Sequence, residues 1–331
     1  MNVRALLPLL LVAAGCGSGS GLHVENNGHT VRTQGGGASP PATTGTAPAT
    51  LPRHVTARVE VGGETRLAWD GSTVWAAAWP AGPGALGSLI PIEARTGTAG
   101  KPLPLPPSPR AYLIAASRGR IWVTAGNRVL RIDPASGALI ASTDVGGPPR
   151  ALLAARGSLW VTVAVGPVVQ LDPDHLHVVR KTTVTPAPYA LTTLGGSVYV
   201  TDEQQQTLVR LDPRTGRSVS TISIRGSGAQ PPSEITAYGD SIWVYEGSSV
   251  VRVGPLGARV LDRIALKGDG GSMAAGTGGI WTTGAFGVAR IDPVTGELNR
   301  PIALGSPGES LATTGDAVWV ATSGAVLRVS A

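Results

Sequence analysis

The chain has 331 residues, of which 42% are hydrophobic and 15% are charged, with a formal net charge of +6 at pH 7 and one cysteine. Its arginines are scattered and form no basic stripe, which excludes a nucleic-acid-binding protein that relies on a basic face. A single cysteine also excludes an internal disulfide framework.

The first residues have the pattern of a targeting segment. Arg4 precedes an apolar run over residues 5–15, which is too short for a permanent membrane span, and small residues stand just before Cys16. We expect residues 1–15 to be a signal peptide. The segment is similar to a bacterial lipoprotein signal, which implies lipidation at Cys16 and anchoring at the extracytoplasmic face of the cell membrane. The alternatives are an ordinary secretory signal or a buried free thiol.

A tether is expected after the cysteine, so that residues 16–53 form a separate region. Gly, Ser, Thr, Pro and Ala dominate residues 17–53 without any hydrophobic period. Such a segment cannot bury enough apolar surface to fold. As a random coil it would reach about 35 Å, which is enough to hold a domain clear of a membrane.

The remaining chain is built from a repeat that contains four short strands. The stretch over residues 112–147 shows it best, with apolar or alternating runs separated by turn residues, and a two-residue turn precedes the second strand. An aromatic residue marks that second strand at intervals of 38 to 47 residues, which is the period of propeller blades. The markers are Trp75, Trp122, Trp160, Tyr199, Trp243, Trp281 and Trp319.

A second type of turn joins the outer two strands of several repeats. It reads Asp-Pro-x-Ser/Thr-Gly at residues 133–137, 212–216 and 292–296. The aspartate can accept turn N–H groups, proline presets φ, and glycine takes the left-handed position. These aspartates are therefore interpreted as structural residues.

The ends of the repeat region predict how the ring closes. The last repeat has three strands and stops without a fourth, whereas residues 54–63 resemble a fourth strand that has no repeat of its own. Residues 54–331 span 278 positions, or about 40 per repeat for seven repeats. We predict an all-β fold, a seven-bladed β-propeller of four-stranded antiparallel blades over residues 54–331, closed by the N-terminal strand.

Function in such a fold is expected at one mouth of the central channel, where loops from all blades meet. By register against the markers, the first strands begin there at Arg66, Tyr112, Arg150, Tyr189, Glu234, Ser272 and Glu309. Aromatic, arginine and carboxylate side chains together are typical of a face that binds a polar ligand, a peptide or a protein. The alternative is that these charges only pair with one another on a solvated rim. The candidate binding residues are Tyr112, Arg150, Tyr189, Asp202, Glu203, Tyr245 and Glu246.

Catalytic patterns are sparse. His23 and His29 lie in the tether, His54 in the closing strand, and His175 and His177 in an outer hairpin, so none falls at a channel position. This disfavours a histidine acid/base pair or a histidine metal cluster. No cofactor is predicted, although a divalent cation held by Asp202, Glu203 and Glu246 is left open.

The second strands carry a recognisable motif: IWVT at 121–124, LWVT at 159–162 and YVTD at 199–202, with RIDP or RLDP third strands at 131, 210 and 290. Residues 54–331 resemble YVTN-repeat surface propellers and the streptogramin (virginiamycin B) lyase type of seven-bladed propeller. That resemblance implies a divalent metal, a histidine pair and an acid at the channel mouth, with the acid at Glu246. Gly247 and Ser248 follow it, and not a histidine.

Two functions are carried forward from the sequence. The first is a membrane-tethered extracytoplasmic lipoprotein, expected to be monomeric, that binds or scaffolds through its channel-mouth loops without bond chemistry. The alternative is a divalent-metal-dependent lyase or lactone hydrolase. A propeller with a quinone cofactor ranks last, because the tryptophans lie between blades.

Overall fold

The computed structural model describes residues 51–80, 86–226, 230–254, 259–266, 268 and 270–330. These residues form strands, turns and loops, and no helix occurs among them; accordingly, no helix there is long and apolar enough to cross a bilayer. The expected signal peptide, Cys16 and nearly all of the expected tether lie outside the described residues.

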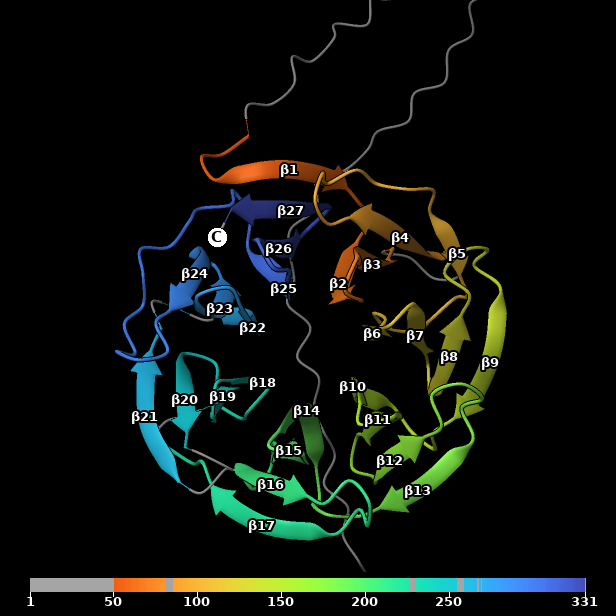
Figure 1. Ribbon diagram of the computed structural model, residues 1–331, viewed down its shortest axis with the longest axis vertical. Coiled ribbons are helices and arrows are strands. Elements are labelled where there is room, and N and C mark those ends of the chain that lie inside the picture. Colours follow the sequence, from red (N-terminus) through yellow and green to blue (C-terminus); the bar gives the residue numbers. More distant parts are fainter. Residues whose placement is uncertain are drawn as a thin grey trace, which may run out of the picture. The chain divides into compact units, whose positions relative to one another are not determined.

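Seven antiparallel sheets stand around a central axis, which confirms the predicted seven-bladed β-propeller (Figure 1). In each blade the first strand lies nearest the axis and successive strands lie farther out. The strands are, from the first to the seventh blade, β2(Glu64–Trp69), β3(Thr73–Trp79), β4(Gly87–Glu93) and β5(Leu103–Leu105); β6(Ile114–Ser117), β7(Arg120–Ala125), β8(Arg128–Ile132) and β9(Leu139–Asp144); β10(Pro149–Ala155), β11(Ser158–Val163), β12(Val168–Leu171) and β13(Val178–Thr182); β14(Pro188–Leu194), β15(Ser197–Asp202), β16(Thr207–Leu211) and β17(Ser218–Ser223); β18(Glu234–Tyr238), β19(Ser241–Tyr245), β20(Ser249–Val253) and β21(Val260–Ala265); β22(Gly270–Gly276), β23(Gly279–Gly284) and β24(Gly287–Ile291); and β25(Gly308–Thr313), β26(Ala317–Thr322) and β27(Ala325–Ser330), with β1(Val55–Glu60).

The ring closes through β1, as predicted. This strand pairs antiparallel with β27, in a register that runs from Val55 opposite Val329 to Glu60 opposite Ala325. The seventh sheet therefore has the order β1-β27-β26-β25 and joins the two ends of the propeller sequence.

The sixth blade has an incomplete outer edge. Its outer segment contacts β24 only through isolated bridges, Val288 with Ile302 and Ile291 with Leu298. Pro301 lies between these bridges and has no N–H to donate, so it interrupts the ladder at an edge strand.

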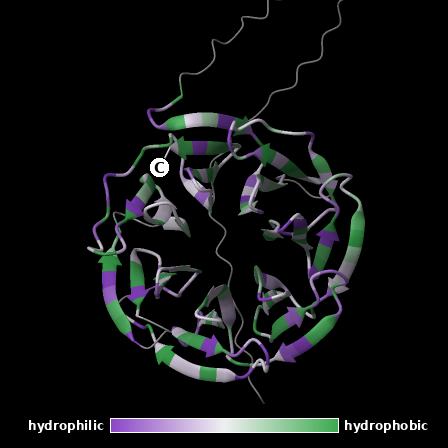
Figure 2. Cartoon of the chain, in the orientation of Figure 1, coloured by the Kyte–Doolittle hydropathy of each residue, from purple (hydrophilic) through white to green (hydrophobic). Residues whose placement is uncertain are grey.

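All seven marker aromatics are buried on second strands, with exposed fractions of 5% or less. Each packs against the next blade in one of seven apolar clusters; Trp319 of the seventh blade, for example, contacts Leu67 and Val74 of the first. Stacking therefore buries faces that a single blade could not cover. Figure 2 shows both hydrophobic and hydrophilic residues along the outer strands, and some of their apolar residues, such as Val178 and Val179, are exposed.

The turns have the predicted chemistry. Arg118 and Gly119 both adopt positive φ, at 51° and 72°, which is the conformation of a type I′ hairpin. In the outer turns, Asp212 accepts the Arg214 N–H at 2.8 Å, and Gly216 adopts φ 71°. The structural interpretation of the repeated aspartates is thus confirmed for this turn, and the same contacts occur at residues 133–137 and 292–296.

One strand boundary differs from the sequence expectation. The first strand of the second blade was expected from Tyr112, but β6 begins at Ile114. Leu113 precedes it and donates its N–H to the Thr124 hydroxyl at 2.9 Å, so a side chain replaces the ladder bond at this point.

Candidate functional site

The central channel contains a cavity of ≈ 330 Å³ whose wall is formed by the beginnings of the first strands of all seven blades. Its polar lining residues include Arg66, Arg150, Tyr189, Glu234 and Ser272, five of the seven positions predicted from the repeat register. A shallower depression of ≈ 350 Å³ extends this cavity at the mouth and shares three of these residues, Arg66, Arg150 and Tyr189.

β-Bulges place these side chains at the mouth. In the third blade the pairing of β10 with β11 passes from Pro149 to Ala151 and skips Arg150. In the fourth blade the pairing of β14 with β15 passes from Pro188 to Leu191 and leaves out both Tyr189 and Ala190. Because a bulged residue is left outside the ladder and its side chain is redirected, the bulges direct Arg150 and Tyr189 away from the sheet faces.

Threonine hydroxyls satisfy backbone amides at these irregular strand starts. Thr201 accepts the N–H of Ala190 at 3.0 Å, and Thr283 accepts the N–H of Ser272 at 3.0 Å. Both threonines are fully buried. The threonine of the recurring second-strand motif therefore supports the irregular strand start. Its recurrence in the sequence was the signal from which this role could have been predicted.

Arg150, Tyr189 and Glu203 form the part of the predicted site that converges. The Arg150 guanidinium carbon lies 5.2 Å from the centre of the Tyr189 ring, which is a cation–π contact. Its Nη2 lies 3.9 Å from Glu203 Oε1, a loose ion pair between partly exposed side chains. The guanidinium therefore retains hydrogen-bonding capacity for a ligand in the mouth.

The other four predicted residues make internal contacts and do not line the cavity. Tyr112 is fully buried and donates its hydroxyl to Pro106 O at 2.6 Å. Asp202 is fully buried and accepts the Ala187 N–H at 3.1 Å. Tyr245 is buried and hydrogen-bonds to Gly247.

Glu246, the position to which the lyase resemblance assigns an acid, is also an internal residue. Its carboxylate is fully buried and forms an ion pair with Arg263 of the outer strand β21. Burial raises the pKa of Glu246, while the Arg263 guanidinium opposes that rise. Arg263 also donates to the Ile224 carbonyl at 2.6 Å, so the pair braces the fifth blade against the end of the fourth.

A second charged group surrounds Arg66, which is in the first blade. Arg66 Nη2 lies 2.7 Å from Glu64 Oε1, and Nη1 donates to the Glu309 carbonyl at 3.1 Å. Burial raises the pKa of the Glu309 carboxyl, and the Glu64 carboxylate raises it further. The Thr65 amide and the Arg66 guanidinium lower that pKa in part.

Glu234 is the cavity residue with the most strongly perturbed acidity. Burial in the channel wall raises its pKa to about 7, and the Arg66 guanidinium opposes the rise. The repeat register predicted Glu234 at the start of a first strand. Nothing in the sequence around it distinguished it from the other first-strand positions as a site residue. Only the structure shows that the carboxyl enters a narrow, partly dehydrated wall.

The open cation site of Asp202, Glu203 and Glu246 is not assembled in this arrangement. Asp202 and Glu246 belong to different blades and contact different partners, Thr185 and Arg263. Within the described residues, Glu246 Oε1 is buried without a hydrogen-bond partner. Of the histidines in the described ranges, none lines the channel cavity.

No protein-family model and no curated protein sequence matches this chain significantly. Solved structures do resemble it. Virginiamycin B lyase from Staphylococcus aureus superposes with a TM-score of 0.68 at 17% identity and covers 83% of this chain and 98% of its own. A catalytically inactive histidine-to-alanine variant of that lyase with quinupristin gives the same score and identity and covers 83% of this chain and 99% of its own.

Other propellers are also similar to this chain. The Swd1 (Cps50) β-propeller domain of Myceliophteria thermophila has a TM-score of 0.69 at 11% identity, covering 84% of this chain and 99% of its own. BamB from Moraxella catarrhalis has a TM-score of 0.56 at 18% identity, covering 82% and 86%. At these identities the likeness shows the fold alone, so the resemblance to streptogramin lyase-type propellers holds for architecture.

Proposed function

We propose that this chain is a membrane-tethered extracytoplasmic lipoprotein that binds a peptide, a protein segment or a small polar ligand through the channel mouth. One observation carries the proposal: bulges in two adjacent blades bring Arg150 and Tyr189 together at the rim of a polar cavity. An arginine stacked on an aromatic ring is held in place before a ligand arrives, so less conformational entropy is lost on binding.

The mouth favours a ligand with an acidic group. The Arg150 side chain is 41% exposed, and its ion pair with Glu203 is long enough for a carboxylate to compete for it. Arg66 lines the same depression but is engaged by Glu64 and a backbone carbonyl. Arg150 is therefore proposed as the anchor, with Tyr189 as the apolar surface beside it.

The test is affinity capture from native membranes after crosslinking, with the full-length protein as bait. We expect a defined partner to be enriched by the parent and lost with the Arg150→Ala/Tyr189→Ala double variant. Arg128→Ala, which removes an exposed arginine bonded to Ser142 on the blade exterior, is the matched control. Equal enrichment by the double variant would refute the proposed face.

Tethering is tested separately. In the native host, the full-length protein should partition with membranes, and Cys16→Ala should release it to the soluble extracytoplasmic fraction, because lipidation requires the thiol. Continued membrane association of Cys16→Ala would refute the lipid anchor without affecting the binding proposal.

The second candidate, a lyase or lactone hydrolase, is favoured by Glu234 alone. A carboxyl with a pKa of about 7 on a cavity wall has the value expected of a general acid or base. We expect any such activity towards cyclic depsipeptides or lactones to require added magnesium, calcium or manganese and to be abolished by Glu234→Gln. Absence of metal-dependent turnover in the parent would remove this candidate.

A further inference from the structure

The outer turn of the third blade, between β12 and β13, departs from the turn that the second, fourth and sixth blades share. Residues 172–177 read Asp-Pro-Asp-His-Leu-His, whereas the corresponding turns have Ser or Thr and then Gly at the fourth and fifth positions. His175 therefore replaces a hydroxyl residue, Leu176 replaces the glycine, and His177 follows directly.

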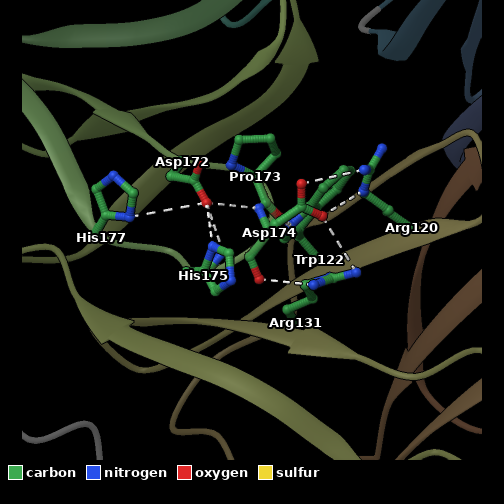
Figure 3. Close-up of polar contacts among 8 residues, drawn as sticks. All are labelled: Arg120, Trp122, Arg131, Asp172, Pro173, Asp174, His175 and His177. Atoms are coloured by element: carbon green, nitrogen blue, oxygen red, sulfur yellow. Dashed lines mark hydrogen bonds and ion pairs between the residues drawn. The ribbon is translucent and has the colours of Figure 1, made fainter.

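These changes bring two imidazoles to one carboxylate (Figure 3). Nδ1 of His175 lies 3.2 Å from Asp172 Oδ1, and Nδ1 of His177 lies 3.9 Å from the same oxygen. One potential ligand atom from each of the three residues lies within 4.8 Å of the others. The imidazole rings are stacked with centroids 6.5 Å apart.

We propose that Asp172, His175 and His177 bind one divalent transition-metal ion such as Zn²⁺. Two imidazole nitrogens and a carboxylate oxygen are a ligand set that zinc uses with an open fourth position. Bonds of about 2.1 Å in a tetrahedron place neighbouring ligand atoms about 3.4 Å apart. The two imidazole nitrogens lie 3.2 and 3.9 Å from Oδ1, the oxygen beside the proposed ligand atom Oδ2, and three ligand atoms within 4.8 Å need to close by about 1.4 Å at most to reach that value.

The backbone that carries these ligands is held from two sides. From the second blade, Trp122 Nε1 donates to Pro173 O at 3.0 Å, and Arg131 donates to Asp174 O at 2.7 Å. From within the third blade, Leu176 is buried, at 1% exposure, in the apolar cluster between the two blades. Leu176 adopts φ 58°, so a non-glycine residue is kept in the left-handed region while its side chain anchors the turn.

The arginines near the turn pair with Asp174 and not with Asp172, so the Asp172 carboxylate can bind a metal ion. Arg120 Nε and Nη2 donate to the Asp174 carboxylate at 2.8 and 3.2 Å, and Arg131 Nη2 also lies 3.5 Å from it. Figure 3 shows Asp174 between Asp172 and the Arg120 guanidinium. Asp174 therefore offsets one of the two guanidinium charges, which reduces their repulsion of a cation.

Asp172 is oriented by the turn itself. Its Oδ1 accepts the N–H groups of Asp174 at 3.0 Å and His175 at 2.7 Å. Within the described part of the chain Oδ2 has no hydrogen-bond donor, so it is available to the ion. Backbone bonds of this kind fix a ligating carboxylate, and the exposed imidazoles, 82% and 64% accessible, need only rotate to meet the ion.

The absence of histidine from the channel positions led us to expect no histidine metal cluster, but that absence concerns only the channel mouth. The turn of the third blade lies on the outer hairpin, so this site is independent of the proposed binding face.

Isothermal titration of the full-length protein with zinc chloride tests the proposal, with an affinity tag that lacks histidine. We expect one equivalent to bind to the parent, and the affinity to fall at least tenfold in His175→Gln/His177→Gln. A His23→Gln/His29→Gln/His54→Gln variant, which removes the three histidines outside this turn, should bind zinc as the parent does. Magnesium should produce no comparable heat, because it prefers oxygen ligands.

Either of two results would overturn the site: no zinc binding by the parent, or unchanged binding by the His175→Gln/His177→Gln variant. Because both imidazoles are exposed, this variant should fold, and far-UV circular dichroism would verify it. Loss of zinc binding in the His23/His29/His54 variant instead would assign the ion to other histidines and refute the proposal.

Discussion

Replacing Glu234 by glutamine should change how stability depends on pH. Burial raises the pKa of Glu234 from 4.5 to about 7 in the folded chain. Between these values the folded state retains a proton that the unfolded state releases, so the free energy of unfolding falls as pH rises. The loss is complete above about pH 7.

The size of the effect follows from the shift. Two and a half pKa units correspond to about 3.4 kcal/mol. Glu234 is not completely screened from channel water, so we expect about 2–3 kcal/mol in practice. Glu234→Gln should match the parent near pH 4.5 and exceed its stability by that amount near pH 8.

Urea unfolding followed by tryptophan fluorescence at several pH values measures this difference. Glu60→Gln, which removes an exposed carboxylate of β1, controls for the change in net charge. Arg66→Gln should enlarge the parent's loss of stability, because the Arg66 guanidinium opposes the shift. Parallel pH profiles for the parent and Glu234→Gln would refute the reasoning.

Two further substitutions test internal contacts. Arg263→Ala should destabilise the protein by about 3–5 kcal/mol near neutral pH, because the buried Glu246 carboxylate loses its ion partner; Glu246→Gln in the same chain should recover part of this in urea unfolding, and no recovery would contradict the pairing. Thr201→Val should cost about 1–3 kcal/mol by leaving the Ala190 N–H without an acceptor; Thr56→Val, at an exposed hydroxyl of β1, is the control for loss of a hydroxyl, and equal losses would contradict the bulge role of Thr201.

The fold could be predicted because the blades repeat the same pattern of strand and turn residues. Aromatic markers such as Trp122 and Trp243 set the register, and paired turn residues with positive φ separated the inner strands. The same register located Arg66, Arg150 and Glu234 on the channel wall. Closure by β1 could be predicted because the last repeat has three strands of its own and lacks a fourth.

The site itself was only partly predictable, because register gives the position of a residue and not what its side chain contacts. Tyr112 is held against Gly87, where any larger side chain would collide with its ring. Glu246 is paired with an arginine 17 residues later, on another strand. Asp172, His175 and His177 are close in the sequence, but their side chains come together because Leu176 adopts the left-handed conformation that glycine adopts in the corresponding turns.

The pairing of β1 with β27 also dictates how the propeller matures. The two strands of one sheet are synthesised almost at opposite ends of the domain, so the earliest segment stays without its neighbour until the latest one emerges. Such a contact is among the most distant in sequence that the fold contains, and non-local pairings of this kind slow folding. The pairing that closes the ring can therefore form only after β27 has been synthesised.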